Sequence, residues 1–109
     1  MKSRDVSRFR TSVYGAVARV PRGCVTTYGL LAKHIGCRSA QAVGQALRNN
    51  PFAPRVPCHR VIASDLTLGG FAGQRTGLAI RRKQALLADE GVLFKNGRLL
   101  HSARLCTFR

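Results

Sequence analysis

A stretch rich in proline and glycine divides this chain and limits what it can fold into. Between Asn50 and Gly77 the helical repeat of apolar residues disappears, prolines stand at 51, 54 and 57, and glycines stand at 69, 70, 73 and 77. Proline lacks a backbone donor and clashes with the preceding helical turn, so no long helix crosses this stretch. We expect residues 56–62 to be a short extended segment or loop, and the residues after them to form a loop long enough to carry function.

Apolar residues before this stretch recur at helical spacing. A repeat of three or four positions from Val6 to Val20 predicts an amphipathic helix that ends at Pro21. Thr26 or Thr27 can cap a short helix that runs through Ile35, and Ser39 can cap a third helix over 40–48. Two short helices joined by residues 36–38 are typical of a helix-turn-helix, although an ordinary helical hairpin has the same pattern.

The last third of the chain predicts one helix and one hairpin. A helix over 78–89 would carry Ile80, Leu86 and Leu87 on its apolar face, with Lys83 and Glu90 at the edge of that face. Residues 92–100 predict a β-hairpin, because Asn-Gly at 96–97 suits a type I′ turn. The expected fold is mostly α with a small β element: a winged-helix-like helix-turn-helix DNA-binding domain with a short C-terminal β-hairpin.

The net charge of the chain indicates the class of molecule that it binds. The chain has 19 Lys and Arg against 4 Asp and Glu among 109 residues, a formal net charge of +15. Such an excess favours a polyanionic partner, of which nucleic acid is the commonest. The high apolar content excludes a disordered basic tail, and no apolar run is long enough to span a membrane. We expect a single domain over 1–109 with no N-terminal companion domain, no signal peptide and a place in the cytoplasm or nucleoid, or in the nucleus of a eukaryote.

The four cysteines do not form a metal-binding pattern. Cys24, Cys37, Cys58 and Cys106 contain no Cys-x-x-Cys pair, and the histidines complete no familiar zinc spacing. We therefore expect no metal, no cofactor and no disulfide framework. One thiol differs from the rest, because Cys58 lies between Pro57 and the basic pair His59-Arg60. Positive surroundings favour the thiolate, the nucleophilic form, although a buried inert cysteine is also consistent with these neighbours.

A catalytic cysteine needs a base and a group that orients the base. His59 is available, and Glu90 is the one inward-leaning acid downstream. In a regular strand Cys58 and His59 would point to opposite faces, so their coupling would need a bend or a water molecule.

Four segments together resemble the C-terminal active domain of the O6-alkylguanine-DNA alkyltransferases, over about residues 9–91. The segment Pro57-Cys58-His59-Arg60-Val61-Ile62 resembles the active-site hexapeptide of the family. Residues 27–32 resemble the segment with its active-site tyrosine, residues 42–51 its recognition helix and asparagine hinge, and residues 86–91 the segment with its glutamate.

The resemblance implies a direct repair reaction. Cys58 would attack the alkyl carbon on O6 of a guanine flipped out of double-stranded DNA, and would keep the alkyl group, so that each molecule reacts once. His59, through a water, would take the thiol proton, and Glu90 would orient the imidazole. Tyr28 would donate toward the departing guanine, and Asn50 would brace the turn before the nucleophile.

The resemblance also implies the surroundings of the base. The carbonyls of Cys58 and Val61 would accept from its exocyclic amine, and Phe71, Ala72 and Gly73 would form the pocket wall. The helix over 40–48 would enter the minor groove of DNA, and the chain would act as a monomer away from membranes. The expected DNA contacts are Arg38, Gln41, Ala42, Gly44, Arg48 and Arg60, with Arg55 and Arg75 nearby.

One departure bears on activity. Gln41 stands where the family usually has the arginine that fills the space of the extruded base. Because extrusion costs on the order of a few kcal/mol, we expect weaker flipping than in an arginine-bearing relative. A non-enzymatic sensor of O6-alkylguanine, similar to the short alkyltransferase-like proteins, is the alternative. Those proteins typically carry tryptophan at the nucleophile position, and this chain has no Trp. A basic architectural DNA-binding module is a third reading, which explains the charge but not the Cys58, His59 and Glu90 set.

Overall fold

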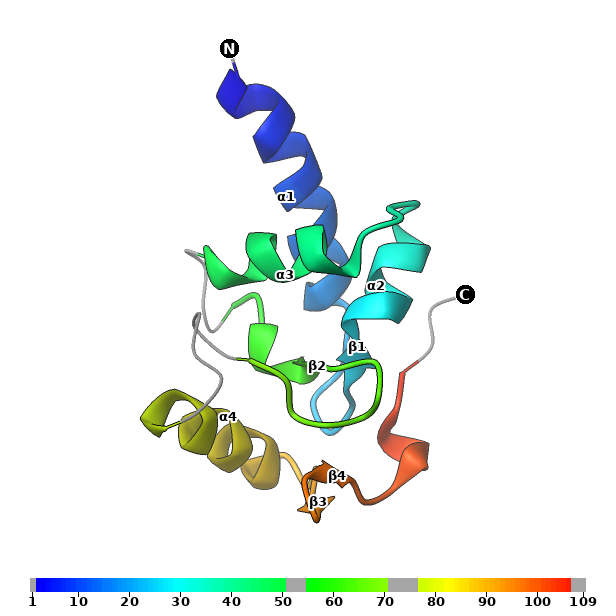
Figure 1. The fold of residues 1–109 in the computed structure, drawn as a ribbon, viewed down its shortest axis with the longest axis vertical. Coiled ribbons are helices and arrows are strands. Elements are labelled where there is room, and N and C mark those ends of the chain that lie inside the picture. Colours follow the sequence, from blue (N-terminus) through cyan, green and yellow to red (C-terminus); the bar gives the residue numbers. More distant parts are fainter. Residues whose placement is uncertain (1, 51–54, 71–76, 107–109) are drawn as a thin grey trace.

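The computed structural model describes residues 2–50, 55–70 and 77–106, with side chains from residue 8 onward. Phe71, Ala72, Gly73 and Arg75 therefore lie outside the described residues. Three helices occupy one half of the molecule, a short parallel strand pair lies beneath them, and the fourth helix and a hairpin form the opposite end (Figure 1).

The first helix, α1 (Lys2–Ala18), begins earlier than the predicted helix over 6–20 and ends two residues sooner. Its last turn tightens beyond Ala18, where the backbone N–H of Val20 donates to the Val17 carbonyl at 3.0 Å. The apolar repeat lies inside as expected: Val13, Val17 and Val20 are fully buried. This face packs against α2 and α3 and forms the larger of two cores.

Helices α2 (Tyr28–His34) and α3 (Ala40–Arg48) begin at the two predicted caps. Thr27 Oγ1 accepts from the backbone N–H of Leu30 at 3.1 Å, and Ser39 Oγ accepts from that of Ala42 at 3.0 Å. The turn between the helices passes through Gly36, whose positive φ of 74° is costly for other residues. The predicted helix-turn-helix is confirmed, with α3 at the predicted bounds.

Two short strands hold the middle of the molecule together; the first was not predicted, and the second forms the end of the 56–62 segment that was expected to be extended or a loop. Strand β1 (Thr26–Thr27) runs parallel to β2 (Val61–Ile62), with Thr26 opposite Val61 and Thr27 opposite Ile62. All four residues are buried. A 3₁₀ turn, η1 (Cys58–Arg60), leads directly into β2. This pair therefore sets the segment with Cys58 beside the start of α2.

Helix α4 (Leu78–Asp89) has its predicted bounds but not its predicted face. Leu87 is fully buried as expected, whereas Leu86 is 38% exposed and the fully buried lysine Lys83 takes an inner position instead. Positions 83 and 87 are one helical turn apart and lie on the same side of the helix, which places Leu86 off that line. With Val92, Leu87 belongs to the second core, below β1 and β2.

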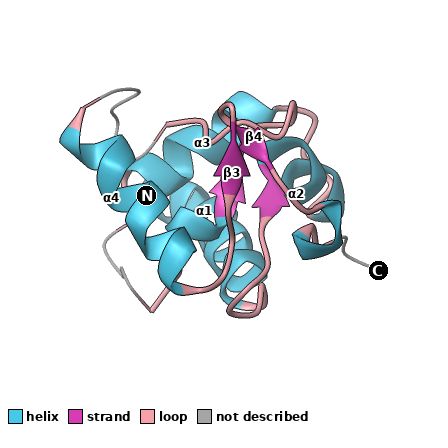
Figure 2. Cartoon of the chain, turned by 90° about the horizontal axis from the view of Figure 1, so that it is seen from below, coloured by secondary structure: helices cyan, strands magenta, loops and turns pink. Residues whose placement is uncertain are grey.

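The predicted hairpin is formed by β3 (Phe94–Lys95) and β4 (Arg98–Leu99), which lie side by side in Figure 2. Both turn residues have positive φ, 52° at Asn96 and 80° at Gly97, as a type I′ turn requires. After the hairpin, the turn η2 (Ser102–Arg104) brings Leu105 into a parallel bridge with Val25. No helix in the described part of the chain is long and apolar enough to cross a membrane.

Candidate active site

The 3₁₀ turn η1 decides how Cys58 and His59 are presented. The segment is not a regular strand at these residues, so the alternation that would separate their side chains does not apply. The backbone N–H of Val61 closes the turn onto the Cys58 carbonyl. His59 is buried with 7% of its surface exposed, and Cys58 is half-buried. Cys58 therefore keeps part of its surface accessible, whereas the neighbouring His59 is buried.

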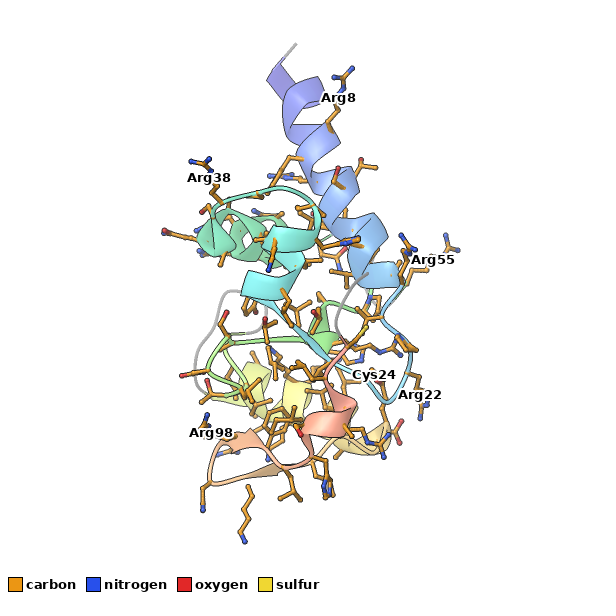
Figure 3. All side chains as sticks on the ribbon, turned by 90° about the vertical axis from the view of Figure 1, so that its right-hand side faces the viewer. Arg8, Arg22, Cys24, Arg38, Arg55 and Arg98 are labelled. Carbon is orange, nitrogen blue, oxygen red and sulfur yellow. The ribbon has the colours of Figure 1, made fainter. Side chains whose placement is uncertain are left out.

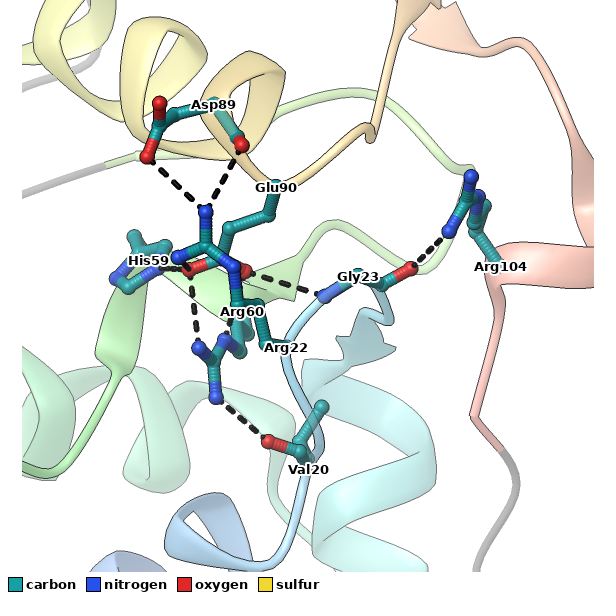
Figure 4. Close-up of polar contacts among 8 residues, drawn as sticks. All are labelled: Val20, Arg22, Gly23, His59, Arg60, Asp89, Glu90 and Arg104. Carbon is teal, nitrogen blue, oxygen red and sulfur yellow. Dashed lines mark hydrogen bonds and ion pairs between the residues drawn. The ribbon is translucent and has the colours of Figure 1, made fainter.

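Glu90 is the centre of the polar groups behind this turn, and we call it with its partners the Glu90 cluster (Figure 4). One carboxylate oxygen lies 2.9 Å from His59 Nε2 and accepts from Arg60 Nη2 at 2.9 Å. The other oxygen accepts from Arg60 Nε at 2.8 Å and from the Gly23 backbone N–H at 3.4 Å. The Glu90 side chain is 5% exposed, so these bonds lie almost out of water.

The electrostatics of Glu90 follow from these contacts. Burial alone would raise the pKa of Glu90, but the hydrogen bonds and positive charges of Arg60 and His59 lower it to about 2. The carboxylate is thus ionised at neutral pH and accepts a hydrogen bond from Nε2 of the imidazole. Nδ1 is then the ring nitrogen that can exchange a proton, because the group bonded to one nitrogen decides the role of the other. The expected placement of Glu90 toward the inside agrees with its position here.

Arg60 was expected among the phosphate contacts, and the structure places it differently. Besides its two bonds to Glu90, its Nη1 donates to the Val20 carbonyl at 2.8 Å. The side chain is 15% exposed. A buried carboxylate needs a buried cation close by, which explains why this arginine turns inward rather than toward solvent. Arg60 therefore joins the segment that follows α1 to the Glu90 cluster.

Tyr28 and Asn50 each make a hydrogen bond in the region around the nucleophile segment. The Tyr28 hydroxyl donates to the Gly70 carbonyl at 3.3 Å, and burial together with the nearby Cys58 raises the pKa of Tyr28 to about 12. Asn50 Nδ2 donates to the Val56 carbonyl at 3.0 Å, across the segment that leads to Cys58. Tyr28 is thus kept protonated, as a hydrogen-bond donor must be.

Sequence reasoning missed one residue of this region. Lys83 was placed at the edge of the apolar face, yet it is fully buried and its Nζ donates to the Val61 carbonyl at 2.7 Å. Its spacing of three from Ile80 and four from Leu87 is the only signal that could have indicated burial. The Val61 carbonyl, expected to face a base, thus has a protein partner already.

The residues expected to contact DNA lie along α3 and its approach. Arg38, Gln41 and Arg48 are exposed, and Ala42 and Gly44 are half-buried. A Cβ added at Gly44 would meet nothing within 4 Å, so the backbone of α3 is open to an approaching surface there. Arg55 is exposed as well, but it lies on the opposite side of the molecule from Arg38 (Figure 3).

No group of three metal-ligating side chains occurs within the described ranges. The site itself offers a thiol, an imidazole, a carboxylate and a phenol: those of Cys58, His59, Glu90 and Tyr28. These groups come from three parts of the chain: η1, the start of α2 and the end of α4.

Comparison with known proteins gives a consistent family. The domain described as "6-O-methylguanine DNA methyltransferase, DNA binding domain" matches residues 8–92. The methylated-DNA–protein-cysteine methyltransferase of Pyrobaculum aerophilum is 46% identical over 74 residues, 68% of this chain and 46% of that protein. That of Methanosarcina acetivorans is 43% identical over 98 residues, 84% of this chain and 60% of that protein. The chain spans about half the length of the curated relatives it matches.

Solved structures that are similar in fold include the following two. S. pombe Atl1 in complex with damaged DNA containing O6-carboxymethylguanine has a TM-score of 0.79 and 31% identity, and the match covers 94% of this chain and 97% of that one. Mycobacterium tuberculosis OGT in complex with DNA has a TM-score of 0.67 and 42% identity, covering 75% of this chain and 48% of that one.

Proposed function

The chain belongs to the 6-O-methylguanine DNA methyltransferase family, and we propose that it repairs DNA by moving an alkyl group from O6 of guanine to Cys58. The match over residues 8–92 agrees with the motifs quoted for the family resemblance. The pairing of His59 with the buried carboxylate of Glu90, next to Cys58, is the observation that carries this proposal.

The reaction balances with the residues at the site. The thiol proton of Cys58 passes to Nδ1 of His59 by way of a water, and Glu90 stabilises the resulting imidazolium. The sulfur then attacks the alkyl carbon in line, so that a sulfur–carbon bond forms as the carbon–O6 bond breaks. The electron pair of the broken bond stays with guanine, and the Tyr28 hydroxyl donates a hydrogen bond toward it. The base then takes up one proton from water, and the imidazolium of His59 returns its proton to water, so that no proton is gained or lost overall. The thioether remains on the protein, and each molecule reacts once.

We propose that DNA approaches α3 through its minor groove and that the alkylated guanine leaves the stack to reach Cys58. Arg38 and Arg48, exposed at the two ends of α3, would contact phosphates without reading sequence. Gln41 would enter the duplex at the first turn of α3 with no positive charge. Residues 1–109 would act as one domain and as a monomer, in the compartment that holds the DNA.

A lesion sensor is the second candidate. S. pombe Atl1 was solved with damaged DNA, and the match to it covers almost all of both chains. Gln41 also favours a protein that binds more than it flips. Against this, Cys58 supplies the thiol that the short alkyltransferase-like proteins typically replace with tryptophan.

Intact-mass spectrometry separates the two. Purified protein mixed with excess O6-methylguanine duplex should gain one methyl group per molecule. Cys58→Ala should gain none, and Cys24→Ala, which removes a thiol of similar exposure away from η1, should gain it as the wild type does. Tight binding without any mass change would support the sensor instead.

A second experiment tests the role of Gln41. Gln41→Arg should raise the transfer rate on duplex DNA much more than on free O6-benzylguanine, because only the duplex reaction includes base extrusion. Equal effects on both substrates would show that extrusion does not limit this protein.

A further inference from the structure

Lys83 is a fully buried lysine that the proposed reaction does not use. Its Nζ donates to three backbone carbonyls: Val61 at 2.7 Å, Gly70 at 3.0 Å and Leu68. It also lies over the Tyr28 ring, 5.9 Å from the ring centroid. We call Lys83 and these three carbonyls the Lys83 cluster.

The number of hydrogen-bond acceptors around Nζ determines whether the Lys83 amine is charged or neutral. An ammonium has three N–H donors and no acceptor, and here each donor has a carbonyl. A neutral amine would turn a lone pair toward one of them. Burial lowers the pKa of Lys83 to about 7, while the nearby Cys58 acts in the opposite direction. The three carbonyls favour the ammonium further, because hydrogen bonds to a charged form stabilise it.

The three carbonyls come from the two segments between which the base is expected. Val61 follows the nucleophile turn, and Leu68 and Gly70 belong to the loop that passes Tyr28. That loop lies close to Tyr28 and to the residue after β2, because a Cβ at Gly69 would lie 3.3 Å from the Tyr28 ring and 3.3 Å from the Ala63 backbone nitrogen. Lys83 therefore holds the strand and the loop at one spacing.

The Val61 carbonyl links this cluster to specificity. A carbonyl oxygen has two lone pairs. With one directed at Lys83, the orientation of the carbonyl is fixed and the other lone pair stays available. We propose that Lys83 is a positioning residue that sets the Val61 carbonyl to accept the exocyclic amine of guanine and holds the 68–70 loop at a fixed distance from it. This inference rests on the proposed function.

The test compares two substrates that differ by that amine, free O6-benzylguanine and O6-benzylhypoxanthine, in wild type, Lys83→Met and Arg82→Met. Arg82 is the neighbouring exposed residue of α4 and gives the same loss of charge. In Lys83→Met, transfer from O6-benzylguanine should fall by about tenfold or more, the size of one charge-assisted hydrogen bond, and the preference for guanine should shrink. Alkylation of Cys58 by iodoacetamide, which needs no base site, should change by less than about threefold.

Two outcomes would overturn the inference: an unchanged preference for guanine in Lys83→Met, or equal losses with iodoacetamide and O6-benzylguanine. If Lys83→Met does not fold, Lys83→Arg replaces it. Its planar guanidinium keeps the charge but cannot direct three donors from one nitrogen, so the preference should shrink again. In ¹⁵N-lysine-labelled wild type at pH 6, one ammonium signal should be protected from exchange and be lost in Lys83→Arg. Absence of such a signal would also refute the Lys83 cluster.

These experiments distinguish failure of the positioning role of Lys83 from failure of the proposed repair reaction. If wild type transfers from O6-benzylguanine and the Lys83 variants keep its preference, only the positioning role fails. If wild type transfers nothing, the repair reaction fails. The comparison of guanine with hypoxanthine is then made by binding of modified oligonucleotides to wild type and Lys83→Arg, and equal preference in the two proteins overturns the positioning role.

Discussion

Replacing Glu90 by glutamine should destabilise the protein far more than a single surface charge does. In the folded chain the pKa of Glu90 falls from its ordinary 4.5 to about 2, which corresponds to about 3 kcal/mol of stabilisation of the ionised form. Glutamine also presents an NH₂ group where Arg60 and His59 both need an acceptor. Removal of one partner from a buried ion pair costs about 3–5 kcal/mol by a separate argument. The two routes agree on about 3 kcal/mol or slightly more.

Asp89→Asn is the matched control, because it removes the same charge from the preceding residue. Asp89 is 77% exposed and pairs only at the surface with Arg22 at 3.2 Å, so its loss should cost less than about 1 kcal/mol. Urea unfolding followed by circular dichroism at pH 7 measures both variants. Glu90→Gln should lower the free energy of unfolding by about 3 kcal/mol with an unchanged slope. Equal losses in the two variants would show that the Glu90 cluster is no stronger than a surface pair.

The other predictions concern pH, a cap and a glycine. The pKa of Glu90 is lower in the folded than in the unfolded chain, so its contribution to the free energy of unfolding is complete above pH 4.5 and disappears as the pH falls toward about 2. Over this range wild type should lose about 3 kcal/mol more stability than Glu90→Gln. Parallel acid-unfolding curves for the two proteins would contradict this. Ser39→Ala removes the cap of α3 and should cost about 1 kcal/mol in thermal or urea unfolding, whereas Ser12→Ala, on an exposed turn of α1, should cost less. In Gly69→Ala the new Cβ would lie against the backbone at a residue with positive φ, so the variant should destabilise the protein by about 1–2 kcal/mol. Gly15→Ala, which has open space around it on α1, should stabilise the protein by up to about 1 kcal/mol. The opposite order of stabilities would refute the close approach of the loop.

Local signals were sufficient for the helices and the hairpin. Ser39 and Thr27 cap the helices that they were expected to cap, and α4 has its predicted bounds. The Asn96-Gly97 pair gave the turn type, because few other sequences take positive φ twice in a row. Each of these features depends on residues a few positions apart, and such features are visible in a sequence.

Contacts between segments that are far apart in the sequence could not be predicted from local sequence patterns. Strands of two residues are too short to show an alternation of apolar and polar residues, so β1 and its pairing with β2 were not predicted, and the β2 residues were expected only within an extended segment or loop. Lys83 was expected at the edge of the apolar face and Arg60 among the DNA contacts, because charged side chains are rarely fully buried, and only their buried acceptors show otherwise. For Cys58, His59 and Glu90 the family motifs supplied what periodicity could not, and the structure added the contact between His59 and Glu90.

The short strand pair has a consequence for how the site tolerates change. Tyr28 follows β1 directly and Cys58 precedes β2 by one turn, so the pairing of Thr26 with Val61 fixes how far the phenol stands from the sulfur along the chain direction. A slip of one residue between the strands would move these groups by about 3.3 Å and turn every following side chain to the other face. An insertion or deletion next to β1 would therefore misalign the phenol and the thiol at once, while one in the exposed tip of the hairpin at Asn96 and Gly97 would leave their alignment unchanged.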